Sequence, residues 1–195
     1  MINIRETLAD HRAVIQRLED LVPDIETVAH RMVSTIQSEG KILWMGNGGS
    51  AADSQHLAAE FVGRFQRERR ALASIALTTD TSTLTAVGND YGYDVIFQRQ
   101  IEALARPQDV VVGISTSGNS ANVLQGIRRA QEMGAFTVGM TGQSGGALKT
   151  SVDVCLSVPA EKTTRIQEAH ILIGHILCHW VETAIINEHE RESAT

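Results

Sequence analysis

The chain contains little proline, cysteine or aromatic side chain. Of its 195 residues, three are proline, two are cysteine and 4% are aromatic. The scarcity of proline and cysteine excludes a collagen-like chain and a disulfide-stapled scaffold. Cys155 and Cys178 both lie in apolar segments and lack the spacing of metal ligands. We therefore expect two buried free thiols in a protein of a reducing compartment.

The chain also lacks an excess of positive charge. It has 17 basic and 23 acidic residues, which gives a net charge of −6. A surface that binds nucleic acid is normally basic, so this balance argues against a nucleic-acid partner. One basic cluster, Arg64 to Arg70, is interrupted by Gln66 and Glu68. We expect that cluster to be a solvated face.

No segment has the layout expected of a membrane protein. The first six residues, Met1 to Glu6, lack the basic and then apolar order of a signal peptide. The most apolar late stretch, residues 171–186, carries His175, His179 and Glu182. Those polar side chains predict a buried helix rather than a membrane span. We expect a cytoplasmic protein without a membrane partner.

The hydrophobic pattern predicts an α/β fold in one domain, residues 1–195. Helical periodicity covers residues 2–38, and strand and helix then alternate through a core and C-terminal helix over residues 41–187. The strands are nearly continuous apolar runs, as in a parallel sheet covered on both faces, so we expect a three-layer αβα domain with a five-stranded parallel sheet. Strands are predicted at Lys41–Met45, Ser74–Thr78, Asp109–Ile114, Phe136–Met140 and Val152–Val158, and helices at Ala51–Phe65, Thr81–Val87, Val95–Ala105, Ser120–Met133 and Thr163–Asn187. The long terminal helices exceed what the sheet needs, and we expect them to pack on other subunits.

Two Ser/Gly segments each stand where a strand passes into a helix. They are Gly46-Asn47-Gly48-Gly49-Ser50 and Ser115-Thr116-Ser117-Gly118-Asn119-Ser120. Glycine lets the backbone approach an anion, and hydroxyls and helix-start N–H groups donate to it. Neither segment has the Gly-Lys-Ser/Thr ending of a nucleotide loop or the dinucleotide pattern G-x-G-x-x-G. The pair therefore indicates a site for a small phosphate, with ordinary strand-to-helix turns as the alternative.

Candidate acid–base and metal groups lie on two of the predicted helices. His56 and Glu60 are four residues apart, so both project from one helix face close behind Ser50. A surface hydrogen bond is the alternative for that pair. The last helix carries an unusual number of polar groups, and buried polar groups need hydrogen-bond partners. A site or a subunit interface would supply those partners. The alternative is that the histidines are core side chains with satisfied hydrogen bonds. The polar groups of this helix are Gln167, Glu168, His170, His175 and His179.

Five motifs together resemble the bacterial phosphoheptose isomerases, which belong to the sugar isomerase (SIS) family of phosphosugar-binding domains. The motifs are residues 46–50, 56–60, 88–92, 115–120 and 165–170, and the resemblance covers about residues 5–187. It implies interconversion of sedoheptulose 7-phosphate and D-glycero-D-manno-heptose 7-phosphate, the first step towards heptose for lipopolysaccharide core or related glycans. It also implies a homotetramer with a central bundle of terminal helices and active sites near subunit interfaces.

The same resemblance assigns roles to individual positions. It implies a phosphate site of Ser115, Thr116, Ser117 and Ser120 with help from Ser50, and sugar contacts from Asn47, Gly48, Gly49, Asn89, Asp90, Glu60 and Gln167. It implies one Zn²⁺ per subunit, held by His56, Glu60, Gln167 and His175. Aldose–ketose isomerisation needs a base and an acid, and Glu60 and His175 are the natural pair. Whether zinc is catalytic or structural stays open at this point.

Two alternatives and one question of assembly accompany this interpretation. A non-catalytic SIS protein that binds the replication initiator shares the fold, but that branch lacks the equivalents of Glu60 and His175. An SIS enzyme for another sugar phosphate is disfavoured by the short single domain and by the His56/Glu60 pair. Gln167 and His175 are eight residues apart on one helix, about 12 Å of rise. That separation favours supplying these two zinc ligands from different subunits.

Overall fold

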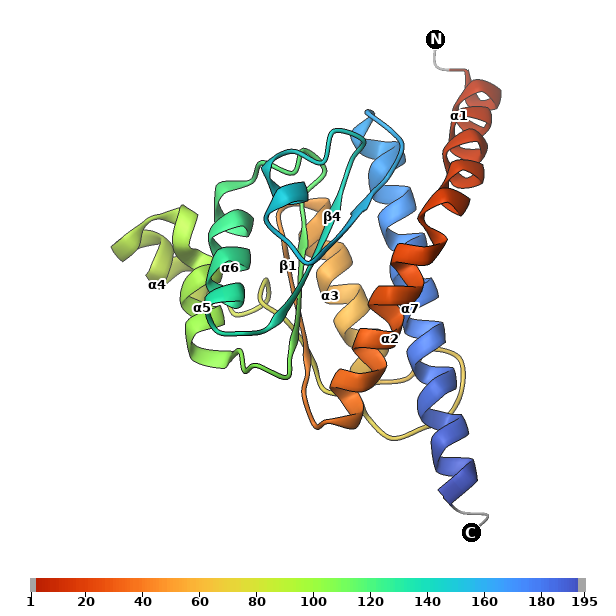
Figure 1. The fold of residues 1–195 in the computed structure, drawn as a ribbon. Coiled ribbons are helices and arrows are strands. Elements are labelled where there is room, and N and C mark those ends of the chain that lie inside the picture. The colour runs from red at the N-terminus through yellow and green to blue at the C-terminus, as the bar shows by residue number, and fades with distance from the viewer. Residues whose placement is uncertain (1–2, 193–195) are drawn as a thin grey trace.

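The computed structural model describes residues 3–192 (Figure 1). The predicted helix start at residue 2 and the outermost residues of the predicted domain lie outside this range. The chain begins with α1 (Ile4–Arg17), a 3₁₀ helix η1 (Leu18–Leu21) and α2 (Val22–Gln37). It ends with α7 (Thr163–Glu192), a helix of 30 residues.

Five parallel strands form one sheet, as the apolar runs predict. They are β1 (Ile42–Gly46), β2 (Ser74–Ala76), β3 (Val110–Ile114), β4 (Phe136–Thr141) and β5 (Val154–Ser157), in the order β2-β1-β3-β4-β5. The strand order reverses between β1 and β3, which are paired from Ile42↔Val110 to Gly46↔Ile114. In open α/β sheets the crevice outside the carboxyl ends of two such strands is the usual ligand site.

Helices cover both faces of the sheet, which confirms the three-layer α/β fold. In Figure 1, α2, α3 (Gly49–Val62) and α7 lie on one side of the strands, and α5 (Ile96–Leu104) and α6 (Ala121–Glu132) lie on the other. Alternate residues of β1 enter the two cores. Ile42 and Trp44 pack with the α2, α3 and α7 side, whereas Leu43 and Met45 pack with the α5 and α6 side.

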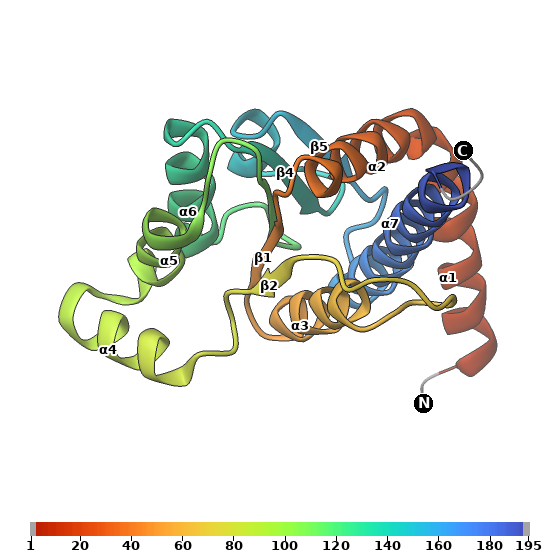
Figure 2. The ribbon, with the colours of Figure 1, turned by 90° about the horizontal axis from the view of Figure 1, so that it is seen from below.

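The remaining short elements connect these layers. They are α4 (Thr81–Tyr91), η2 (Tyr93–Val95) and η3 (Ala147–Thr150). Figure 1 shows α4 projecting from the body of the molecule, on the side away from α7. Figure 2 shows α1 beside α7, and Arg165 of α7 donates to the Thr7 carbonyl at 2.7 Å.

Predicted and observed element ends differ by a few residues, most clearly at α3. This helix starts at Gly49 instead of Ala51 and ends at Val62 instead of Phe65. It starts early because Gly48, with φ +56, turns the backbone directly into the helix. It ends early because the chain leaves the helix at Gly63.

One described helix, over Thr163–Glu188, is long and apolar enough to span a membrane by length and composition. In this structure 56% of the apolar 18-residue stretch of this helix is buried, and Ile173, Leu177 and Val181 lie in the core. It is a core helix of the α/β fold. Cys178, within it, is a buried free thiol, and burial raises its pKa to about 12. Cys155 is free but only half-buried, contrary to the expectation that both thiols are buried.

Candidate active site

The two Ser/Gly segments follow β1 and β3, the neighbouring strands at which the strand order reverses. Gly48 is the N-cap of α3, and a Cβ atom on it would meet nothing within 4 Å. Ser50, in the first turn of α3, is buried. Both segments therefore lie at the carboxyl edge of the sheet, at the starts of α3 and α6, which favour an anion.

The 115–120 segment gathers hydroxyl groups around one point. The Ser115 Oγ lies 2.9 Å from the Ser120 Oγ and 3.5 Å from the Ser117 Oγ. Ser120 is the N-cap of α6, but its side chain makes no capping hydrogen bond to that helix. Its hydroxyl instead joins the cluster, as expected for a site that binds phosphate through neutral donors.

Gly118 shapes this segment. Its φ is +67, and a Cβ atom there would lie 1.9 Å from the Gly145 carbonyl oxygen. The Leu148 N–H donates to the Gly118 carbonyl at 2.9 Å. The second Ser/Gly segment is thus braced by the loop that follows β4.

A pair of side-chain amides joins the first Ser/Gly segment to α6. Asn47 and Asn122 each donate to the other's side-chain oxygen at 2.9 Å, and the Tyr93 hydroxyl donates to the Asn47 Oδ1 at 3.1 Å. Asn122 is buried in the first turn of α6. Sequence reasoning missed Asn122 and Tyr93, because nothing in their local pattern indicates a partner 75 or 46 residues away.

The acid–base candidates meet where α3 packs against α7. The His56 Nε2 lies 3.1 Å from the Glu60 Oε1 and 3.4 Å from the His175 Nε2. Gly174 lets the helices approach, since a Cβ atom on it would lie 2.5 Å from the Leu57 Cδ2. One chain therefore assembles His56, Glu60 and His175 without a partner subunit.

The donor set of this cluster suits zinc. Two ligands about 2.1 Å from a tetrahedral Zn²⁺ lie about 3.4 Å apart, which is the His56–His175 separation. Imidazole nitrogen and carboxylate oxygen are ordinary zinc ligands. In residues 3–192 no three His, Cys, Asp or Glu side chains already surround a common point as a full metal site. His56, Glu60 and His175 therefore fit zinc, and their three side chains would have to move closer together to surround the ion.

Gln167 lies at the other end of the α3–α7 contact. Its Nε2 would be 2.5 Å from a Cβ atom on Gly49, so this glycine leaves room for the amide at the start of α3. Gln167 thus borders the first Ser/Gly segment, eight residues before His175 on α7. Its part in zinc binding, and the supply of Gln167 and His175 from different subunits, stay predictions.

The other predicted positions lie on separate elements. Thr116 and Ser117 line a cavity of about 530 Å³ with Gln143 and Glu161. Asn89 and Asp90 are exposed on α4, and the Asn89 Nδ2 donates to the Asp90 Oδ1 at 2.8 Å. No hydrogen bond joins either residue to the rest of the candidate site within the described chain, so their contact with the sugar stays a prediction.

Asp53 is a further acidic group on this side of α3, three residues before His56. Burial raises its pKa above the ordinary value, and the nearby His56 opposes that rise. Its Oδ2 is buried without a hydrogen-bond partner among the described residues. Asp53 lies on α3 between Ser50 and His56. Sequence reasoning overlooked this carboxyl group beside the candidate site.

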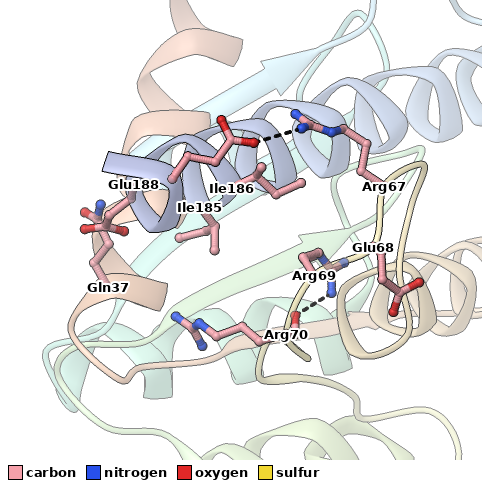
Figure 3. A pocket seen from close by; sticks show the side chains of 9 residues that line it. Gln37, Arg67, Glu68, Arg69, Arg70, Ile185, Ile186 and Glu188 are labelled. Atoms are coloured by element: carbon pink, nitrogen blue, oxygen red, sulfur yellow. Dashed lines mark hydrogen bonds and ion pairs between the residues drawn. The ribbon is translucent and has the colours of Figure 1, made fainter. Parts of the chain in front are cut away.

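The expectation of a solvated face at residues 64–70 is wrong for Arg69. Its side chain is only 3% exposed and pairs with the buried Glu182, whose Oε1 lies 3.4 Å from the Arg69 Nε. Arg67 does face solvent, and it pairs with Glu190 beside a cavity of about 480 Å³ (Figure 3). The sequence of the basic cluster does not show this difference, because contact with α7 determines which arginine is buried.

Comparison with known proteins agrees with this arrangement. The model of the SIS domain matches residues 8–142. The phosphoheptose isomerase of Roseiflexus sp. (strain RS-1) is 56% identical over 88% of this chain and 87% of that protein. The phosphoheptose isomerase of Geotalea daltonii is 52% identical over 95% of this chain and 97% of that protein.

A solved structure shows the same likeness in three dimensions. The phosphoheptose isomerase of Neisseria gonorrhoeae superposes with a TM-score of 0.88 at 45% identity, over 92% of this chain and 97% of that one. Fold, loop motifs and sequence identity thus agree along nearly the whole chain. The chain belongs to the SIS domain family and, within it, to the phosphoheptose isomerases.

Proposed function

We propose that this protein interconverts sedoheptulose 7-phosphate and D-glycero-D-manno-heptose 7-phosphate, and so supplies heptose for lipopolysaccharide core or related glycans. The contact of His56, Glu60 and His175, along α3 from the first Ser/Gly segment, carries the proposal. The relatives at 56% and 52% identity are phosphoheptose isomerases. They give no support to the alternative of a non-catalytic protein that binds the replication initiator.

The geometry suits a phosphosugar bound by its phosphate at one end. His56 lies seven residues beyond Gly49 on α3, about 10 Å along the helix axis. That is of the order of the length of an extended seven-carbon sugar. A phosphate held by Ser115, Thr116, Ser117 and Ser120, with help from Ser50, therefore leaves C1 and C2 within reach of the His56 cluster.

The reaction moves a proton between C1 and C2 through an enediol. Glu60 takes the proton from carbon and returns it to the neighbouring carbon, and His175 protonates or deprotonates the oxygen atoms. Asn47, Gly48, Gly49, Asn89, Asp90 and Gln167 orient the sugar chain. Zn²⁺ held by His56, Glu60, Gln167 and His175 would supply Lewis-acid stabilisation of negative charge on oxygen, and Glu60 or His175 would have to release the ion before acting on the substrate.

The direct test is incubation of the purified protein with sedoheptulose 7-phosphate, followed by NMR detection of the aldoheptose phosphate. Formation of that product supports the function, and its absence at high protein concentration contradicts it. Equilibrium dialysis of metal-free protein tests the cofactor separately. We expect about one Zn²⁺ per chain, and loss of tight binding in His56→Ala and His175→Ala.

We also propose a cytoplasmic homotetramer built through the terminal helices. Ile4 and Leu8 of α1 are 72% and 58% exposed, and Ile176 and Trp180 of α7 are also exposed. Large exposed apolar side chains on neighbouring helices are typical of subunit contacts. Light scattering after size-exclusion chromatography should give four times the 21.2 kDa chain mass; a monomer would contradict this assembly.

A further inference from the structure

Arg69 closes the carboxyl end of α3. Its Nη1 donates to the carbonyl oxygens of Phe61 at 2.9 Å and Gly63 at 3.0 Å, and its Nη2 donates to the Glu60 carbonyl at 2.7 Å. The last carbonyls of a helix have no partner within it, and a positive charge there is favoured by the helix dipole. One buried guanidinium thus holds the backbone of the proposed carbon base and of the residues that follow it.

Glu182 of α7 holds the next part of the chain. Its carboxylate accepts from the backbone N–H groups of Phe65 and Gln66, both at 2.8 Å, and of Arg67 at 3.0 Å. Its side chain is 1% exposed, and it pairs with Arg69. Burial alone would raise the pKa of Glu182, but the three N–H donors and Arg69 lower it overall. The carboxylate is therefore ionised and fully engaged at neutral pH.

Phe65, whose N–H is bound by Glu182, lies against the proposed catalytic histidine. Its ring centroid is 5.4 Å from that of His175, with an interplanar angle of 38°. It is also 6.2 Å from the ring of His179, one turn further along α7. The anchored loop thus covers one side of the His175 imidazole.

We propose that the Arg69–Glu182 ion pair is the positioning device of the active site, holding Glu60 on α3 and Phe65 over His175 in fixed relation. This inference rests on the proposed function, because it gives Glu60 and His175 their acid–base roles. Arg69 and Glu182 bond to the backbone of Glu60 and Phe65, and in this proposal they act through Glu60 and His175 and not on the substrate.

The location of the pair sets it apart from ordinary surface charges. A buried ion pair contributes little net stability compared with well-packed apolar side chains, because both charges lose their hydration. Here the ion pair fixes the orientation of the backbone, since each of its hydrogen bonds holds a particular carbonyl or N–H group at or next to Glu60 or Phe65. Arg67, in the same loop, pairs with Glu190 of α7 and is a natural control because both side chains are at least half exposed.

The test combines kinetics with a spectroscopic signature of His175. Phe65→Leu removes the ring next to His175. The His175 Hε1 NMR signal of this variant shows in which direction the signal moves when ring-current shielding is lost. It is measured on metal-free protein with a chelator present. Glu182→Gln should move that signal in the same direction. It should also lower kcat by about 10-fold or more with KM changed less than about twofold, since small misplacements of reacting groups are costly. Arg67→Met/Glu190→Gln should change neither.

Two results would overturn the proposal. One is a folded Glu182→Gln protein with the parent's His175 signal and a kcat within twofold of the parent. The other is a control variant that changes as much as Glu182→Gln. If Glu182→Gln does not fold, Arg69→Met/Glu182→Leu removes both charges together and takes its place.

If the double variant also fails to fold, the test is the kcat of Phe65→Leu, and an unchanged kcat in that variant overturns the proposal. The NMR signature needs no turnover, so it separates this inference from the proposed function. A parent protein without isomerase activity refutes the function, whereas an unmoved His175 signal refutes the positioning role.

Discussion

The Nε2 atoms of His56 and His175 lie 3.4 Å apart, although 119 residues separate the two histidines in the sequence. One belongs to α3 and the other to α7, which run side by side from Gly49 and Gln167 to this contact. Two ring nitrogens so close together need a shared proton or a shared cation between them. The proposed acid–base chemistry and the proposed zinc ion therefore share one place.

Replacing Glu60 by glutamine removes a base while keeping the shape of the side chain. We expect kcat for isomerisation to fall by about 10²-fold or more, with KM little changed, because general base catalysis contributes that order of rate. Steady-state kinetics with sedoheptulose 7-phosphate measure it. Glu132→Gln, at the far end of α6, is the matched control and should retain the parent's kcat. Near-parent turnover of Glu60→Gln would remove Glu60 from the role of carbon base.

Replacing Ser117 and Ser120 together by alanine removes two of the three clustered hydroxyls. We expect KM to rise at least about 10-fold, since hydrogen bonds to a charged group are worth about 1.5–3 kcal/mol each. The change in kcat should be smaller, because the phosphate is remote from C1 and C2. Ser38→Ala, on the exposed end of α2, serves as the control. Unchanged phosphosugar binding in the double variant would place the phosphate elsewhere.

His170 should make the protein less stable in mild acid. Burial lowers its pKa to about 4, although its Nε2 bonds the Thr141 carbonyl at 3.1 Å and opposes that shift. The unfolded chain protonates this imidazole near pH 6.5, whereas the folded chain resists until about pH 4. Its contribution is therefore complete above pH 6.5 and is lost as the pH falls towards 4, by ~3 kcal/mol.

Denaturant unfolding at several pH values between 7.5 and 4 measures this dependence. His170→Gln has no group that titrates in this range, so its free energy of unfolding should vary less with pH than that of the parent. Equal slopes for the two proteins would contradict the buried neutral state of His170.

Replacing Gly118 by alanine should disturb the proposed phosphate site more than the strain of its positive φ alone would. The new Cβ would lie 1.9 Å from the Gly145 carbonyl oxygen, so one of the two loops must move. Gly92→Ala is the matched control, because φ is +95 there but nothing lies within 4 Å of the Cβ position. Backbone strain costs about 1–3 kcal/mol at either site.

We expect the loss of stability and the rise in KM to be larger for Gly118→Ala. Thermal unfolding and phosphosugar kinetics measure the two effects. If both variants behaved alike, overlap with Gly145 would have no part in shaping the second Ser/Gly segment.

Much of the fold could be predicted because its signals are local. Unbroken apolar runs indicate a parallel sheet, and the interval between His56 and Glu60 places both on one helix face whatever surrounds them. The same holds for the serine cluster, since Ser115 and Ser120 are close along the chain. These features depend on neighbours within about one turn or one loop.

The rest depends on contacts between distant segments. Nothing local distinguishes Arg69 from Arg67, and only Glu182, more than a hundred residues later, buries one of them. Asn122 likewise has an ordinary sequence context until Asn47 comes opposite it. Gln167 was expected beside zinc, and its contact with Gly49 appears only when α3 and α7 are packed together.

The dependence on α7 has a consequence for the order of events during translation. All five strands precede α7 in the chain, so the sheet is synthesised before the helix that carries His175 and Glu182. Until then the backbone after Glu60 lacks the carboxylate that anchors it, and His56 has no opposite imidazole. A nascent chain stalled before residue 175 would hold all five strands and both Ser/Gly segments, but neither His175 nor Glu182. The proposed acid–base cluster is therefore the last part of the candidate site to be completed.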